Sequence, residues 1–136
     1  MTSIDLRNIL VRDCMHHGIV SCTEDARLGE VAEMMATHRV HAVAVTGGNG
    51  QRPVAIVFDR DVAAAAASGA EPTAREVAAT NPLTIAANQP MHDAAARMAE
   101  HGVSHLVVVD NASGFPIGIL STLDVAVLYA RAMRDE

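Results

Sequence analysis

The chain has 136 residues, a formal net charge of −6, and 50% hydrophobic but only 2% aromatic residues, which suits one ordinary domain with an aliphatic core. The negative charge argues against nucleic-acid binding, because phosphates are neutralised by clustered basic residues, and two cysteines without Cys-x-x-Cys spacing provide no disulfide framework. The first ten residues lack a signal-peptide pattern and the longest apolar runs are too short to span a bilayer, so we expect a cytoplasmic protein with no membrane association.

The first half of the chain predicts two helices and three strands in the order β-α-β-β-α. Thr23 and Asp25 offer N-cap oxygens for a first helix that ends near His38, and Gly69 stops the second helix. A glycine-rich turn at 47–50 separates the second and third strands. The predicted elements are a strand at 19–22, a helix that follows these caps and has Leu28, Val31, Met34 and Met35 on one face, strands at 43–45 and 53–58, and a helix at 59–67.

The second half repeats this order after residues 68–73, which we interpret as a linker. Its predicted elements are a strand at 83–85, a helix at 91–100, strands at 106–109 and 117–120, and a helix at 122–132. Shifted by 63 positions, the halves align without a gap, and the matching residues include His38 with His101, Pro53 with Pro116 and Asp61 with Asp124. A fixed period of this kind indicates duplication, so we predict one repeat at 1–68 and another at 74–136.

The sequence therefore predicts an α/β (α+β) fold of two βαββα units. One such unit has helices on one side of its sheet and leaves the other, apolar side bare. Two units can cover each other's sheets around a pseudo-twofold axis, with the sheets packed together and the helices outside. This arrangement would leave two equivalent clefts, where we expect a ligand to bind.

A short motif in the second repeat carries the chemistry of such a site. Gly118 has no side chain to obstruct a ligand, and Ser121 falls where a strand meets a helix, so its hydroxyl can cap the helix or bind a phosphate. Asp124, one turn later, can accept two hydrogen bonds from the vicinal hydroxyls of a ribose. The alternative is that Ser121 only caps the helix and Asp124 only favours its start.

These residues resemble the cystathionine-β-synthase-type (CBS) family over nearly the whole chain. The segments that carry the resemblance are Val11-Arg12-Asp13-Cys14-Met15, Val103 to Asp110, and Gly118-Ile119-Leu120-Ser121-Thr122-Leu123-Asp124. The last fits the family's Gly-x-x-Ser/Thr-x-x-Asp ribose-phosphate motif in full. The resemblance implies a stand-alone tandem CBS module that binds AMP, ATP or another adenosyl compound, requires no cofactor, and is not an enzyme.

The first repeat departs from the motif. It keeps the acidic residue as Asp61, but Phe58 stands at the position of Ser121 and cannot bind a phosphate. Phe58 could plug its cleft, face the core or stack on a base, and Arg60 could compensate by reaching a phosphate. The two clefts are therefore expected to differ, with the Asp61 cleft the weaker.

The resemblance also implies that each cleft takes its base-binding wall from the opposite repeat. The cleft of Gly118, Ser121, Thr122 and Asp124 would add Cys14, Ile19, Val20, Val40 and His41. The cleft of Phe58, Arg60 and Asp61 would add Leu83, Thr84, Val103, Ser104 and His105. Ile19 and Val40 could instead be core residues, and His105 a surface residue.

Other interpretations are weaker. Cys14, His16, His17 and Cys22 lack the paired spacing that zinc sites usually show, so we predict no metal. The alanine run 63–67 suits a tight subunit contact, although alanine also serves helix propensity alone. We expect a homodimer through the repeat helices that regulates an unidentified protein. The alternative function is a ligand-free interaction or scaffold protein that keeps the fold.

Overall fold

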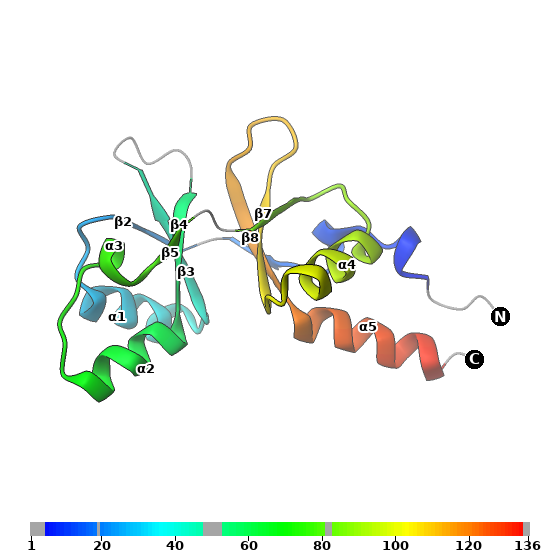
Figure 1. Ribbon diagram of the computed structural model, residues 1–136. Helices are drawn as coiled ribbons and strands as arrows, with labels where there is room; N and C mark the ends of the chain where they lie inside the picture. Colours follow the sequence, from blue (N-terminus) through cyan, green and yellow to red (C-terminus); the bar gives the residue numbers. More distant parts are fainter. Residues whose placement is uncertain (1–4, 19, 48–52, 81–82, 135–136) are drawn as a thin grey trace. The chain divides into compact units, whose positions relative to one another are not determined.

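The computed structural model describes residues 5–18, 20–47, 53–80 and 83–134 of the chain (Figure 1). Its contacts divide the chain into two compact units, Ile19–Pro82 and a second unit that joins Met1–Gly18 to Leu83–Glu136. Each unit contains one mixed four-stranded sheet, and the described residues form five α-helices in all. Among these described residues, no helix combines the length and the apolar character needed to cross a membrane.

The unit Ile19–Pro82 has its strands in the order β2-β3-β4-β5. The β2–β3 pair is parallel, and β4 is antiparallel to both β3 and β5. The strands are β2 (Ser21–Thr23), β3 (Ala42–Thr46), β4 (Pro53–Phe58) and β5 (Ala79–Thr80), and the helices are α1 (Leu28–His38), α2 (Asp59–Ser68) and α3 (Ala74–Val77). Figure 1 shows α1 and α2 next to each other on one side of this sheet.

The core of this unit lies between the sheet and its helices. Val43 and Val45 alternate along β3 to point at one face, and α1 buries Val31 and Met35 against them. The period of two along the strand and of about 3.6 along the helix explains why these residues meet. The α2 helix ends at Gly69, whose φ of 73° provides the left-handed C-cap that the sequence predicted.

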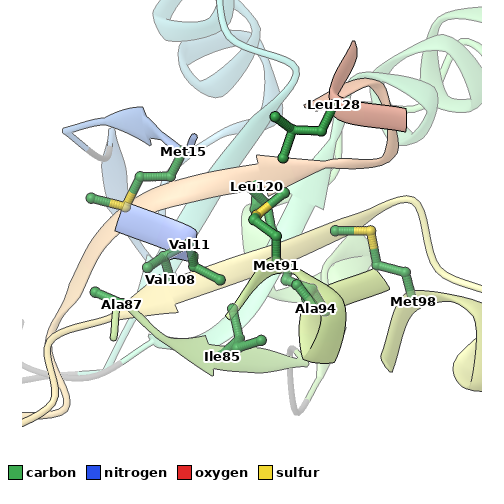
Figure 2. Close-up of a cluster of buried hydrophobic side chains, with 11 residues drawn as sticks. Val11, Met15, Ile85, Ala87, Met91, Ala94, Met98, Val108, Leu120 and Leu128 are labelled. Atoms are coloured by element: carbon green, nitrogen blue, oxygen red, sulfur yellow. The ribbon is translucent and has the colours of Figure 1, made fainter. Parts of the chain in front are cut away.

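The second unit has the same plan, with the strand order β1-β8-β7-β6. Its strands are β1 (His16–His17), β6 (Thr84–Ala86), β7 (His105–Val109) and β8 (Pro116–Ser121), and its helices are α4 (Met91–His101) and α5 (Thr122–Arg134). Short 3₁₀ turns at Leu6–Asn8 and Val11–Asp13 precede β1. Figure 2 shows Val11 and Met15 of the N-terminal segment in the same buried cluster as Val108 and Leu120.

Each repeat is completed by a short segment that precedes the other repeat in sequence. We call residues 5–18 the N-terminal arm and residues 71–80 the middle arm. Strand β1 of the N-terminal arm pairs antiparallel with β8, and β5 of the middle arm pairs antiparallel with β4 at the equivalent register, since His16 faces Ile119 and Ala79 faces Ile56. The sequence repeats and the compact units therefore do not coincide, although the division into repeats at 1–68 and 74–136 remains a prediction.

Backbone carbonyls of the arms also accept hydrogen bonds from the first N–H groups of α1 and α4. The Leu28 N–H donates to the Pro72 carbonyl at 2.9 Å, and the Met91 N–H donates to the Ile9 carbonyl at 2.7 Å. The N-cap of α1 is Arg27, which makes no side-chain capping bond. The prediction that Thr23 and Asp25 cap this helix is therefore wrong, because a carbonyl distant in sequence takes the N–H group that they were expected to satisfy.

The ten elements predicted from the sequence are all present, with ends that differ by at most a few residues. The prediction missed β1, β5, α3 and the 3₁₀ turns, all of which lie in the arms. Residues 68–73 were predicted as a linker. They include the last residue of α2, and Pro72 and Thr73 bond to Leu28 and Arg27 at the start of α1. The turn at 47–50 lies largely outside the described residues, and the packing of one sheet on the other remains a prediction.

Candidate functional site

The predicted Ser121–Asp124 motif forms a reciprocal cap at the start of α5. The Asp124 Oδ2 accepts hydrogen bonds from the Ser121 backbone N–H at 2.8 Å and from the Ser121 hydroxyl at 3.2 Å. The Asp124 N–H in turn lies 3.4 Å from the Ser121 Oγ. This is the capping-box pattern, in which two side chains satisfy the backbone at a helix start. The sequence analysis gave helix capping as the alternative role of Ser121 and Asp124, and the structure contains this cap. The cap uses one of the two carboxylate oxygens of Asp124.

The N-terminal arm brings a histidine to the other carboxylate oxygen. The His16 Nε2 lies 3.4 Å from the Asp124 Oδ1, and the side chains of these residues are 74% and 14% exposed, respectively. The pairing of β1 with β8 produces this proximity, since it sets His16 beside Ile119, at the end of the sheet where α5 begins. Asp124 is thus a mostly covered carboxylate that lies next to an exposed imidazole.

Gly118 lies where the N-terminal arm crosses β8. A Cβ at this position would be 2.5 Å from the His16 carbonyl oxygen and 3.0 Å from the Met15 Sδ. Real Cβ atoms are essentially never found as close to another atom as the first of these distances. The glycine therefore permits the arm to approach β8, while its predicted role beside a ligand remains a prediction.

Cys14 belongs to the same unit and is half-buried against its core. Burial raises the pKa of the Cys14 thiol, and the negative charges of Asp13 and Asp124 raise this pKa further, whereas Arg131 acts in the opposite direction. The thiol is therefore a poor nucleophile near neutral pH, because little thiolate is present.

Ser104 directly precedes β7, and His105 is the first residue of that strand. The Ser104 carbonyl accepts a hydrogen bond from the Thr122 N–H at 2.9 Å, so the first N–H group of α5 is already used within the protein. The Ser104 hydroxyl lies 2.9 Å from the His105 Nδ1. His105 is half-buried, and its part in a cleft remains a prediction.

The equivalent position in the other unit keeps the cap and lacks the hydroxyl. The Asp61 Oδ2 accepts a hydrogen bond from the Phe58 N–H at 2.8 Å, the same distance as in the Asp124 cap. Phe58 is half-buried, and the Arg60 guanidinium lies 5.2 Å from the centre of its ring, within the range of a cation–π contact. His41 contacts Asp59 through a 2.8 Å Nδ1–Oδ2 pair.

The remaining residues predicted for the two clefts are divided between the units. Val20 and Val40 are half-buried and pack against the core of the unit Ile19–Pro82. Leu83 and Val103 pack against the core of the second unit, and Thr84 lies in β6. Ile19 lies outside the described residues. The contribution of each residue to a cleft shared by both repeats remains a prediction.

Sequence reasoning missed the approach of His16 to Asp124. His16 was considered there only as a metal ligand, together with Cys14, His17 and Cys22. Among the described residues, no group of three or more His, Cys, Asp or Glu side chains could hold a metal ion. No local signal in the sequence indicates this approach, because β1 is only two residues long and pairs with a strand about a hundred residues away.

A family model described as "CBS domain" matches the chain twice, at residues 11–68 and 74–131. Among solved structures, a CBS domain protein from Pyrobaculum aerophilum complexed with AMP is 32% identical, with a TM-score of 0.80 over 92% of this chain and 99% of that one. The CBS domain pair of the protein MJ0100, in complex with 5′-methylthioadenosine and S-adenosyl-L-methionine, has a TM-score of 0.78 over 89% of this chain and 95% of that chain, at 23% identity, and shows the likeness of fold.

A curated relative extends well beyond this chain. The homoserine O-acetyltransferase of Methanosphaerula palustris is 30% identical over 126 residues, which are 93% of this chain and 25% of that protein. The chain therefore spans about a quarter of the length of this relative.

Proposed function

The chain belongs to the CBS domain family, and we propose that it is a non-enzymatic regulatory module that binds an adenosyl compound, such as AMP or ATP, at the Ser121–Asp124 motif. The observation that carries this proposal is the AMP complex of a relative that is 32% identical over nearly the full length of both chains. The intact ribose-phosphate motif of the second repeat supports the same ligand class.

The geometry at Asp124 suits a ribose that displaces His16. The Oδ2 atom is held in the helix cap, while the Oδ1 atom lies 3.4 Å from the Nε2 of the exposed His16, a distance longer than that of a strong hydrogen bond. Rotation of His16 toward solvent would free Oδ1 for the hydroxyls of a sugar. A hydrogen bond to a carboxylate contributes about 1.5–3 kcal/mol, so Asp124 would account for a large part of the affinity.

The Asp61 cleft is proposed as the weaker or empty site. Asp61 has the same cap as Asp124, but Phe58 supplies no hydroxyl and Arg60 lies over the Phe58 ring. An arginine held over an aromatic ring is less available to a phosphate, because moving it would break the cation–π contact.

We further propose that the module acts in the cytoplasm as a homodimer, and that ligand binding changes the geometry of the dimer and thereby the activity of a partner protein. A ligand can shift such an equilibrium only if it binds one geometry more tightly than the other. The partner is an expectation from the family. No catalytic role is proposed, since the match to the acetyltransferase covers only a quarter of that protein.

Isothermal titration calorimetry with AMP, ATP, NAD and S-adenosylmethionine tests the proposal. We expect at least one of these compounds to bind, and Asp124→Ala to weaken its binding by about tenfold or more, as the loss of one or two charge-assisted hydrogen bonds requires. The matched control is Asp61→Ala, which removes an equivalent 2.8 Å capping bond but leaves the complete motif in place.

The two variants should lose similar stability, about 1 kcal/mol for a helix cap, which thermal denaturation can verify. Absence of heat with all four compounds would favour the ligand-free scaffold. Equal affinity in wild type and Asp124→Ala would place the ligand elsewhere.

A further inference from the structure

The N-terminal arm places a titratable side chain beside the carboxylate of the candidate site. The His16 Nε2 lies 3.4 Å from the Asp124 Oδ1, and the Asp124 Oδ2 accepts the hydrogen bonds of the helix cap. The Asp124 side chain is only 14% exposed, so little of its surface is left for other partners. A ribose hydroxyl that bonds to Oδ1 would therefore compete with His16 for the same atom.

The backbone of His16 is held in place, whereas its side chain lies in solvent. Strand β1 pairs with β8, and Val11 and Met15 of the N-terminal arm are buried in the core of the second unit. The His16 side chain is 74% exposed, and an exposed side chain can change rotamer without disturbing a packed core. A ligand could thus displace the imidazole while the N-terminal arm stays paired with β8.

The first repeat builds the same arm and the same cap without a histidine. The 63-residue shift places Ala79 at the position of His16, and Ala79 faces Ile56 in β4 as His16 faces Ile119 in β8. The Asp61 cap in this repeat has the same 2.8 Å bond to a backbone N–H as the Asp124 cap. Neither the pairing of the arm nor the cap therefore requires His16.

The charge of the imidazole depends on pH in the physiological range. Histidine ordinarily changes its charge between about pH 5 and 8, and a protonated imidazole is attracted to a carboxylate by its charge. The titratable or charged groups on the elements around His16 are Asp13, Cys14 and His17 of the N-terminal arm, Asp124 and Arg131 of α5, and His105 of β7. Of these groups, Asp124 lies within ion-pair distance of the His16 ring.

We propose that His16 is a competitor built into the ligand site, so that binding at Asp124 weakens as the pH falls and His16 becomes protonated. In the ligand-free protein the charged imidazole would pair with Oδ1, and a ribose must displace it. The 5′-phosphate of a nucleotide lies across the ribose from the 2′ and 3′ hydroxyls, so it does not replace Asp124 as the partner of His16. This inference rests on the proposed function, because it assigns a regulation to the same site.

Isothermal titration calorimetry with AMP at two pH values tests the competition. At about pH 5.5, where histidine is mostly protonated, we expect His16→Ala to bind AMP about two- to fivefold more tightly than wild type, as the loss of a partly exposed ion pair implies. At about pH 8 the two proteins should bind AMP about equally. Comparison at the same pH removes the effect of the titration of the AMP phosphate itself.

The matched control is His17→Ala. His17 is the other residue of β1 and is also exposed, but successive residues of a strand point in opposite directions. This variant should bind AMP as wild type does at both pH values. If it bound AMP as His16→Ala does, the effect would come from the general charge of the arm, and the specific role of His16 would be wrong.

A measurement without ligand tests the contact separately. Thermal denaturation of His16→Ala, Asp124→Asn and the double variant forms a double-mutant cycle. We expect the decreases in Tm to add at the higher pH, where the imidazole is neutral. At the lower pH the double variant should lose less than the sum of the single variants, because the two residues share one interaction. Additive decreases at both pH values would overturn the contact on which the competition depends.

The binding outcomes separate this inference from the proposed function. An equal pH dependence of AMP affinity in wild type and His16→Ala would overturn the inference and leave the proposed ligand site standing. Weaker binding by His16→Ala at the lower pH would also overturn it, since the imidazole would then help to hold the ligand. Absence of AMP binding by all variants at both pH values would overturn the inference together with the choice of AMP as a ligand.

Discussion

At the scale of single residues, the candidate site depends on a glycine and a carboxylate that each serve the fold. Gly118 allows the His16 carbonyl to lie close to β8, and Asp124 holds the Ser121 N–H at the start of α5. Both residues are in the motif that resembles a ribose-phosphate site. These structural roles involve the helix cap and the contact with the N-terminal arm, and they are compatible with binding of a ligand by the same residues.

Replacing Gly118 with alanine should displace the N-terminal arm. The new Cβ would be 2.5 Å from a backbone oxygen, which cannot move without separating β1 from β8. We expect a loss of about 1–3 kcal/mol in the free energy of unfolding, as for other overpacked sites, together with faster hydrogen exchange in residues 11–17. Gly29→Ala is the control, because a Cβ there meets no atom within 4 Å and alanine favours the helix. Equal effects of the two variants would contradict the close approach.

We expect the reactivity of the Cys14 thiol to depend on the charge at Asp124, since that charge is one cause of the raised Cys14 pKa. Burial and the nearby carboxylates raise the pKa of Cys14, so its thiolate fraction at pH 8 is below that of an ordinary thiol. Asp124→Ala removes one negative charge and should lower this pKa, which raises the rate of alkylation by iodoacetamide at pH 8. Mass spectrometry of the labelled peptides measures the rate.

Cys22 is the internal control for this experiment. Burial, followed by the charge of Glu30, raises its pKa, so Asp124→Ala should leave its labelling rate unchanged. Acceleration at both cysteines would indicate general loosening of the fold, and a constant Cys14 rate would argue against the proximity of Asp124.

At the scale of elements, the two arms are the unexpected feature. They contribute the edge strands β1 and β5, and their carbonyls bond the first turns of α4 and α1. The N-terminal arm thus stabilises a sheet and a helix of the second repeat, and the middle arm stabilises a sheet and a helix of the first. The arm of residues 5–18 also brings His16 to Asp124, which makes it part of the candidate site.

Val11→Ala tests the packing of the N-terminal arm. Val11 is fully buried in the core of the second unit, so removing two methyl groups should cost about 1–3 kcal/mol. Hydrogen exchange should then accelerate in β6, β7 and β8. The matched variant Val43→Ala, in the core of the unit Ile19–Pro82, should accelerate exchange in β2, β3 and β4 instead. If Val11→Ala instead accelerated exchange in β2, β3 and β4, the N-terminal arm would pack on the first repeat.

At the scale of the whole molecule, a duplication has diverged in two places. The motif with Gly118 and Ser121 is complete in one repeat and reduced in the other, where Phe58 replaces the serine. The outer helices have diverged as well, since α5 is bulky and basic at its end while α2 is lined by alanines. The first of these differences favours one strong ligand site per chain.

The sequence alone determined the duplication, the ten elements of the two repeats and the position of the Gly118–Asp124 motif. The duplication is visible as a fixed shift of 63 residues, and the elements depend on local signals such as the period of apolar residues and the glycine after α2. Local signals act between neighbours in the chain, so they are visible before any folding.

Only the tertiary structure decided which repeat each arm completes and which residues meet Asp124. Strands β1 and β5 are two residues long, too short to show a period, and His16 pairs with a residue about a hundred positions away. The failed prediction that Thr23 and Asp25 cap α1 has the same origin, because the bonding group is the Pro72 carbonyl. Contacts between distant segments depend on how the chain closes on itself, and no pattern among neighbouring residues encodes them.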